Sequence, residues 1–375
     1  MLWSYDLPPD RIAKYPLPQR HDARLLIYRG GHIQETIFLH LAEHLPPGTR
    51  LFYNDTKVIP ARLRQGKFEL LLTELTEGKW DEGPPQVWKA LFRPGRFWRR
   101  GGELTWESAP LTFKVRWLND ADERQGYFSA EWHPPHYSAL DVLQAFGTPP
   151  LPPYLKREAE PEDSARYQTI YAHKPGSVAA PTAGLHFTPE VWKSLAQRGI
   201  QTYPLTLHVG IGTFLPLKTP DAPEKHPMHA ERFAISKETL SALRKLDGPV
   251  LCVGTTTLRL IESLYWLGLS YAKGEKSPSI VPLIWQQTPV DVSPKEALAA
   301  LPDELHGITS LYLLPGYPFQ IADALITNFH MPDSTLLALV QAFIGEKAIQ
   351  AVYEYALKNG FRFLSYGDTS LLWRH

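Results

Sequence analysis

Apolar residues occur along this chain in two patterns, short runs and longer amphipathic segments. The short runs predict strands at 25–28, 33–38, 50–53, 203–209, 249–254 and 310–314. The longer segments carry helix start and stop signals, and they predict helices at 189–198, 237–246, 257–267, 335–344 and 346–358. Thr188, Ser236 and Ser334 are expected as N-caps, and the stops are expected at Gly199, Gly268, Gly345 and Gly360. Strands that alternate with helices predict an α/β core.

A different pattern occupies residues 64–147. Short β-branched and aromatic runs lie at 67–75, 86–92, 103–106, 110–117 and 126–132, and no helical repeat occurs before 138–146. Such spacing is typical of a small antiparallel barrel or sandwich. We therefore expect an open-sided α/β core, formed by residues 1–63 and 148–375, with an inserted small antiparallel β-barrel domain at 64–147. Residues 270–308 are expected to form a surface excursion.

Composition narrows the class of protein. The 375 residues are 43% hydrophobic and 21% charged, as in an ordinary globular protein. Lys+Arg and Asp+Glu balance at 39 each, so any contact with RNA requires a local basic patch. The single cysteine, Cys252, excludes an internal disulfide framework. With no signal-peptide profile and no apolar run long enough to span a bilayer, we expect a cytoplasmic protein.

Small residues, glycines and prolines are concentrated at 173–190. Gly176 and Gly184 leave room for a ligand near the backbone, while Thr182, His186 and Phe187 add a hydroxyl, a titratable group and a stacking face. A tightly packed connection between two elements explains the same composition equally well.

Clusters of similar composition accompany other predicted strands, at 54–62, 207–214, 253–262, 315–317, 323–332 and 365–368. Open α/β sheets bind ligands at the carboxyl ends of their strands. We therefore expect these segments to surround one cavity, with an opening shared by His186, His208 and His330.

Two of these clusters favour particular ligands. The glycines at 210 and 212 lack the third glycine and the helix of a dinucleotide fingerprint, so they indicate only close approach of a ligand to the backbone. The helix start after Gly254 suits a carboxylate or a phosphate. Arg259 and Glu262 share a helical face and either contact a ligand or pair on the surface.

The histidines at 186, 208, 229 and 330 have no His-x-x-x-His spacing and no partner cysteine, so the sequence does not favour a metal site. A Gly-x-Ser-x-Gly nucleophile and a phosphate-binding loop are also absent.

A basic and aromatic stretch at 86–102 is a candidate nucleic-acid contact. Cations at Lys89, Arg93, Arg96, Arg99 and Arg100 alternate with aromatic residues, and the stretch contains no acid. Such a stretch can bind phosphates and stack on bases. A solvated strand edge is the alternative.

Several long motifs resemble one family. They are YDLP at 5–8, YPLP at 15–18, NDTKVIPAR at 54–62, PLPPY at 150–154, RYQTIYA at 166–172, AAPTAGLHFT at 179–188, VGTT at 253–256, PGY at 315–317 and LITNFH at 325–330. The chain resembles the S-adenosylmethionine:tRNA ribosyltransferase-isomerase family of the queuosine pathway. The lead into the barrel, RQGK at 64–67, is shorter than in that family.

The resemblance implies an α/β catalytic domain with an inserted barrel, and it implies the reaction. The ribosyl part of S-adenosylmethionine is transferred to 7-aminomethyl-7-deazaguanine at the tRNA wobble position and is rearranged to give epoxyqueuosine. Adenine and methionine leave. S-adenosylmethionine is then a substrate, no metal or other cofactor is expected, tRNA is the partner, and we expect a monomer.

This reaction needs carboxylates for two cationic reactants, a base, and stacking surfaces for two nucleobases. The expected catalytic residues are His186, His208, His229, Glu231, His330 and Asp368. The expected substrate contacts are Thr182, Gly184, Phe187, Gly210, Gly212, Thr213, Thr255, Thr256, Arg259, Glu262, Tyr317, Asn328, Phe329 and Tyr366.

Two other functions remain open from the sequence. A non-catalytic RNA-binding relative fits the loosely matching barrel, and a small-molecule α/β isomerase or hydrolase fits the core without RNA. An adenine-release assay distinguishes the non-catalytic relative from the ribosyltransferase-isomerase. Binding to an anticodon stem-loop distinguishes the small-molecule enzyme from it.

Overall fold

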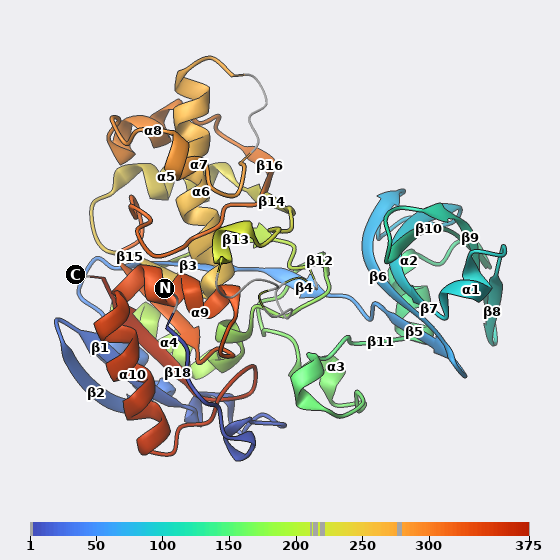
Figure 1. Ribbon diagram of the computed structural model, residues 1–375, viewed down its shortest axis with the longest axis horizontal. Coiled ribbons are helices and arrows are strands. Elements are labelled where there is room, and N and C mark those ends of the chain that lie inside the picture. The colour runs from blue at the N-terminus through green and yellow to red at the C-terminus, as the bar shows by residue number, and fades with distance from the viewer. Residues whose placement is uncertain (1–2, 211, 213–216, 218–221, 276–279, 375) are drawn as a thin grey trace.

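The computed structural model describes residues 3–210, 212, 217, 222–275 and 280–374. Its main element is a nine-stranded mixed sheet (Figure 1). The strand order is β16 (Leu305–Thr309), β14 (Glu231–Ile235), β13 (Gln201–Leu207), β3 (Arg50–Asn54), β15 (Val250–Val253), β17 (Ala324–Asn328), β18 (Thr369–Trp373), β1 (Arg24–Arg29) and β2 (His32–Ile37).

The four central strands β13, β3, β15 and β17 are parallel, so their carboxyl ends meet at one edge of the sheet. Strand β18 is antiparallel to β17, with Asn328 opposite Thr369, so the segment that precedes β18 lies at the same edge. This register brings together chain segments that are far apart in sequence.

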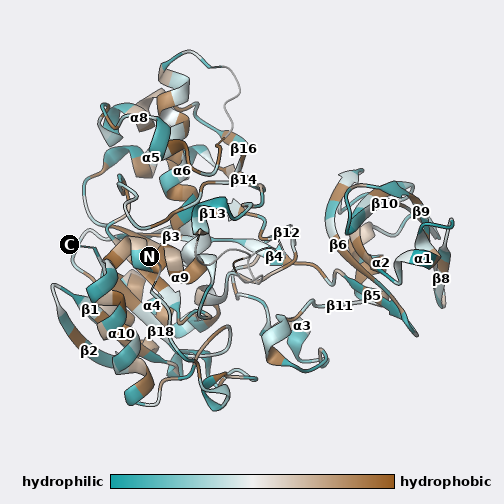
Figure 2. Cartoon of the chain, in the orientation of Figure 1, coloured by the Kyte–Doolittle hydropathy of each residue, from teal (hydrophilic) through white to brown (hydrophobic). Residues whose placement is uncertain are grey.

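Helices cover both faces of this sheet. They are α4 (Pro189–Gln197), α5 (Lys237–Lys245), α6 (Thr255–Ala272), α7 (Ile284–Gln287), α8 (Pro294–Ala300), α9 (Thr335–Ile344) and α10 (Glu346–Lys358). One core joins α6, α9 and α10 to the sheet, and a second joins α4 and Phe38 to the other face. In Figure 2, α9 is mostly hydrophobic, whereas α10 alternates along its length.

A second, seven-stranded antiparallel sheet curls around its own core and lies to the right in Figure 1. Its order is β11 (Gly147–Thr148), β5 (Arg62–Gln65), β6 (Phe68–Glu77), β7 (Gln86–Arg93), β10 (Gln125–His133), β9 (Leu111–Asp120) and β8 (Glu103–Ser108). Short helices α1 (Gly95–Trp98) and α2 (Ala139–Phe146) accompany it. A third short helix, α3 (Asp163–Arg166), follows, and the small sheet of β4 (Thr56–Val58) and β12 (Lys174–Ser177) lies at the junction.

The fold class is therefore the predicted one, a mixed α/β core with a curled antiparallel sheet inserted in its sequence. Gly30 and Gly31 form the hairpin turn between β1 and β2, both with positive φ. The side chains of Ser236 and Ser334 cap α5 and α9 as predicted. Thr188 does not cap α4 with its side chain, because its hydroxyl lies 2.8 Å from His21 Nδ1.

Several predicted elements are wrong. Helix α6 continues past Gly268. The backbone of Ala297 in α8 packs so closely against Gly268 that a Cβ would not fit there. The strand predicted at 310–314 lies instead at β16, Leu305–Thr309, so part of the 270–308 segment belongs to the sheet. Strand β17 lies within the polar cluster at 323–332, where the pattern predicts no strand, and the cluster at 365–368 precedes β18.

Among the described residues, no single helix has both the length and the apolar composition to cross a membrane. Helices α9 and α10 meet that test only as a joined pair, and they bend by 116° at their break.

Candidate functional site

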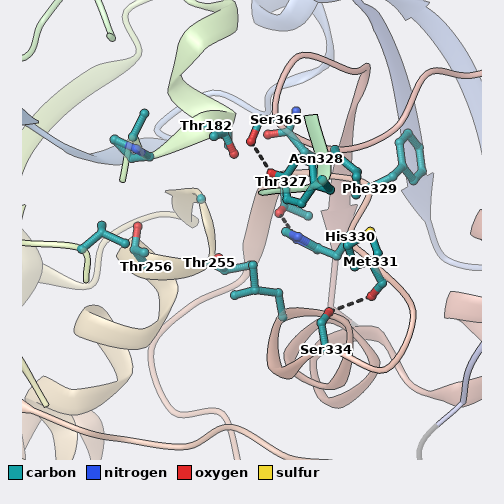
Figure 3. Close-up of a pocket in the computed structure, with 18 of the residues that line it drawn as sticks. Thr182, Thr255, Thr256, Thr327, Asn328, Phe329, His330, Met331, Ser334 and Ser365 are labelled. Carbon is teal, nitrogen blue, oxygen red and sulfur yellow. Dashed lines mark hydrogen bonds between the residues drawn. The ribbon is translucent and has the colours of Figure 1, made fainter. Parts of the chain in front are cut away.

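A cavity of about 240 Å³ opens at the carboxyl edge of the central strands (Figure 3). Its walls come from the segments that precede α4, follow β13, β15 and β17, and precede β18. These are residues 180–183, Val209, 254–256, 327–332 and 364–365, with Pro153, Tyr154, Ser334 and Leu336. Of the predicted segments, 173–190, 207–214, 253–262, 323–332 and 365–368 contribute to this cavity, whereas 54–62 and 315–317 do not line it. We call it the main cavity.

The main cavity is lined by neutral side chains. Its described lining residues include hydroxyls, an amide, an imidazole and aromatic or apolar groups, and they include no Asp, Glu, Lys or Arg. Figure 3 shows Thr255 and Thr256 on one side of the space and Asn328, Phe329 and His330 on the other. A neutral cavity of this composition suits an uncharged heterocycle better than an ion, because a buried ion needs a charged partner.

Two buried polar atoms at this cavity have no hydrogen-bond partner among the described residues, Asn328 Oδ1 and Thr256 Oγ1. The amide of Asn328 is held from its other side, because Nδ2 donates to His186 Nε2 at 3.2 Å and to the Asp368 carbonyl at 3.4 Å. A buried group without a partner costs about 1–3 kcal/mol. A ligand that forms hydrogen bonds with both atoms removes this cost and therefore binds more tightly.

His330 is the one imidazole among the residues that line the main cavity. Its Nε2 lies 2.8 Å from Thr327 Oγ1, and its backbone N–H donates to the Tyr353 hydroxyl at 3.0 Å. Burial lowers the pKa of His330 to about 3. The ring is therefore neutral at pH 7, which is the form that can accept a proton.

A smaller cavity of about 40 Å³ adjoins the main cavity, with which it shares Thr255, Thr256 and Leu336. It is lined by charged groups, with Glu231 from the start of β14 and Arg259 from the first turns of α6. The two form a buried ion pair, and Glu231 Oε1 also accepts from the Gly210 N–H at 3.1 Å. Burial lowers the pKa of Arg259 only to about 10, so the guanidinium remains charged at pH 7. We call this the charged cavity.

The structure brings together many of the predicted site residues. Thr182, Thr255, Thr256, Asn328, Phe329 and His330 line the main cavity, while Gly212, His229, Glu231, Thr255, Thr256 and Arg259 line the charged cavity. Thr213 lies outside the described residues. Gly210 contacts the charged cavity through its N–H alone. Gly184 lines neither cavity. The Tyr171 hydroxyl occupies the space that a Cβ at position 184 would fill.

The structure corrects the prediction for three residues that lie in the core. The Phe187 ring is fully buried against Phe38 and Trp192. Glu262 does not pair with Arg259. Its carboxylate accepts the backbone N–H groups of residues 320–322, and the Tyr317 hydroxyl donates to it. Phe187, Tyr317 and Glu262 therefore support the walls of the site and do not contact a ligand.

The expectation that His186, His208 and His330 share one opening is wrong. His186 and Tyr366 line a small separate cavity, where the pKa of His186 is lowered to about 4 by burial. His208 lines a hollow between the two large sheets, opposite Trp80, and bonds Thr56 Oγ1 at 2.9 Å. Asp368 lines neither the main nor the charged cavity; it pairs with Arg362 and accepts the N–H groups of residues 24 and 362.

The five basic residues predicted to contact the nucleic acid are not equally available to bind it. Arg93 pairs with Glu69 and Arg99 with Asp120, while Lys89 is half-buried in β7. Arg96 and Arg100 line a shallow hollow with Lys67 and Phe97 on the curled sheet. Neither has an ion-pair partner in the described part of the chain. Part of the positive charge of this stretch is therefore neutralised by ion pairs within the curled sheet.

Sequence reasoning missed some residues of the site. Tyr154 and Ser365 line the main cavity and are bonded to each other through their hydroxyls, yet neither was assigned a role. Tyr154 follows a proline cluster, where only the resemblance drew attention to it. Within the described ranges, no group of three or more His, Cys, Asp or Glu residues is placed to hold a metal ion.

The neutral histidines predict a pH dependence of stability. The pKa values of His186 and His330 lie near 4 and 3, below the value of about 6.5 in an unfolded chain. As pH falls from 7 to 5 the unfolded chain binds protons first, so each histidine lowers the free energy of unfolding by about 2 kcal/mol. Urea unfolding at these two pH values measures the loss, and a His186→Gln variant should lose less. Equal free energies at both pH values would refute this assignment.

Fold and site together define an α/β protein with an inserted curled sheet and a nucleobase-sized cavity at the carboxyl edge. A family model described as queuosine biosynthesis protein matches residues 1–372. A Halothermothrix orenii protein named S-adenosylmethionine:tRNA ribosyltransferase-isomerase is 38% identical over 99% of this chain and 98% of its own length. A protein of the same name from Moorella thermoacetica is 39% identical over the same shares.

A crystal structure of S-adenosylmethionine tRNA ribosyltransferase from Thermotoga maritima is similar to the chain at 29% identity and a TM-score of 0.49. The similarity covers 98% of this chain and 99% of that one. On the strength of the family model and the relatives, the chain belongs to the queuosine biosynthesis protein family.

Proposed function

We propose that this chain is a ribosyltransferase-isomerase that acts on tRNA. It transfers the ribosyl moiety of S-adenosylmethionine to 7-aminomethyl-7-deazaguanine at the wobble position and isomerises it. The products are epoxyqueuosine in tRNA, adenine and methionine. The observation that carries the proposal is the 38% identity across nearly the whole chain to proteins named for this activity. The relatives' names support the enzyme, so the non-catalytic alternative is set aside.

The main cavity supports this chemistry. Its unpartnered Asn328 Oδ1 and Thr256 Oγ1 suit the amino group and ring nitrogens of a purine, whereas the Phe329 ring packs in the core against Phe361 and Phe363. His330 is neutral and stands beside this space, so it is our candidate base. His186 has an indirect role, because its Nε2 accepts a hydrogen bond from the Asn328 amide and holds that amide in place. S-adenosylmethionine is a substrate here, and the proposal includes no metal and no further cofactor.

The curled sheet and the hollow beside it support the tRNA part of the proposal. The hollow lies between β6 and its following turn on one side and the α/β core on the other, and it carries Lys79, Lys174 and Arg232 together with Trp80. Lys79 and Arg232 are paired with Glu82 and Glu74, and Trp80 is half-buried. Cations and an accessible aromatic edge suit a nucleic-acid strand. We propose that residues 64–147 form the tRNA-binding domain and that residues 1–63 and 148–375 form the catalytic domain of a cytoplasmic monomer.

The direct test supplies S-adenosylmethionine and tRNA that carries the deazaguanine precursor. We expect one adenine released for each tRNA modified, and His186→Ala is expected to reduce that release at least about 10-fold, because Asn328 loses its support. Chromatography measures adenine, and circular dichroism checks that the variant is folded. Wild-type turnover in this variant would remove His186 from the site. No adenine from the wild-type chain, with tRNA bound, would refute the proposed activity.

A further inference from the structure

We propose that S-adenosylmethionine lies across the two adjoining cavities, with its adenosine part in the main cavity and its amino-acid group in the charged cavity. This inference rests on the proposed function and adds the orientation of the substrate and the residues that select it. Four features of the site carry it, namely charge, size, unpartnered polar atoms and the shared wall.

Charge separates the two cavities. The amino-acid end of the substrate carries an ammonium and a carboxylate, and the adenine is neutral. The described lining of the main cavity contains no charged side chain, whereas the charged cavity contains Glu231 and Arg259. Burying a zwitterion among neutral groups would cost its hydration without replacement. The opposite orientation is therefore disfavoured.

Size gives the same assignment. The charged cavity has about 40 Å³, which corresponds to about three water molecules at roughly 10–15 Å³ each. Such a space suits a small head group and excludes a purine. The main cavity has about 240 Å³, enough for the larger part of the molecule.

The charged cavity offers complementary groups at short range. Arg259 keeps a buried Nε–H without a hydrogen-bond partner among the described residues, although its terminal nitrogen pairs with Glu231. That N–H suits a carboxylate, and the Glu231 carboxylate, which accepts the Gly210 N–H through Oε1 and pairs with Arg259 through Oε2, suits an ammonium as a further donor. Arg259 and Glu231 are 9% and 5% exposed, so water does not screen these contacts strongly.

The shared wall joins the two parts. Thr255 and Thr256 begin α6, an 18-residue helix, and they line both cavities. A ligand that passes from one cavity to the other must cross these hydroxyls. In this orientation the sulfur lies at this crossing, beside the hydroxyls of Thr255 and Thr256.

Two neutral-sulfur compounds test this orientation, S-adenosylhomocysteine and 5′-methylthioadenosine. Both carry adenosine, and only the first carries the amino-acid group. Calorimetry on the wild-type chain should show S-adenosylhomocysteine binding about 10- to 100-fold more tightly, as expected for charge-assisted hydrogen bonds. Glu231→Gln and Arg259→Lys should each bring the two affinities together while leaving the affinity for 5′-methylthioadenosine unchanged.

Asn328→Ala is the reciprocal control, because it should weaken both compounds by the same factor. Retained binding of 5′-methylthioadenosine also reports that each variant is folded, and either of the two charge variants suffices for the test. If both charge variants still prefer S-adenosylhomocysteine as the wild-type chain does, and adenine release still occurs, the proposed orientation of the substrate is overturned but the proposed function is not. A wild-type chain that binds neither compound and releases no adenine would overturn the proposed function as well.

Discussion

His330→Gln is expected to lower the rate of adenine release by about 100-fold or more, with little change in stability. Positioned acid–base groups contribute about 10²–10⁴-fold to a rate. Glutamine has a similar length and can bond Thr327, but it cannot accept a proton at neutral pH. The backbone at position 330 is held independently, by Tyr353 and by the Tyr5 hydroxyl, so the substitution should not displace β17.

The matched control is His40→Gln, at an exposed histidine whose Nδ1 bonds the nearby Glu43. It should release adenine at the wild-type rate. Single-turnover assays with precursor tRNA separate chemistry from product release. If His330→Gln reacts within a few-fold of wild type, His330 is not the base, and a residue of the charged cavity such as His229 takes its place among the candidates.

Glu262→Ala is expected to destabilise the fold by about 3–5 kcal/mol, or to prevent folding. The carboxylate is fully buried and accepts three backbone N–H groups, from Gln320, Ile321 and Ala322, as well as the Tyr317 hydroxyl. Alanine leaves these donors buried without an acceptor, and each such donor costs about 1–3 kcal/mol before the segment relaxes. The loop that leads into β17 loses its anchor.

Glu238→Ala is the matched control, at an exposed glutamate in the first turn of α5. It should change the free energy of unfolding by less than about 0.5 kcal/mol. Denaturant titration followed by tryptophan fluorescence gives both values. A loss below 1 kcal/mol for Glu262→Ala would show that the loop does not depend on this carboxylate.

Much of the fold could be predicted from the sequence because its signals are local. The side chain of Ser334 caps α9, and Gly345 and Gly360 end helices with positive φ. The strands of the curled sheet follow the pattern of β-branched and aromatic runs. Strand β17 could not be predicted in this way, because it is a buried five-residue strand next to the polar residues of the site.

The arrangement of the site depends on pairings that are distant in sequence. Arg259 pairs with Glu231 across two elements rather than with Glu262 on its own helix, because α6 is buried along most of its length and its charges need interior partners. The sequence located the loops, since parallel strands end at one edge. It could not show which histidine faces which cavity, because that depends on side-chain packing.

In the proposed reaction, the main cavity holds the adenosine part of S-adenosylmethionine. A crystal structure of the chain with S-adenosylhomocysteine tests it most directly. We predict that the adenine lies beside Asn328 and Thr256, with the amino-acid group at Arg259. Ligand found instead in the hollow beside His208, with the main cavity free of it, would contradict the account.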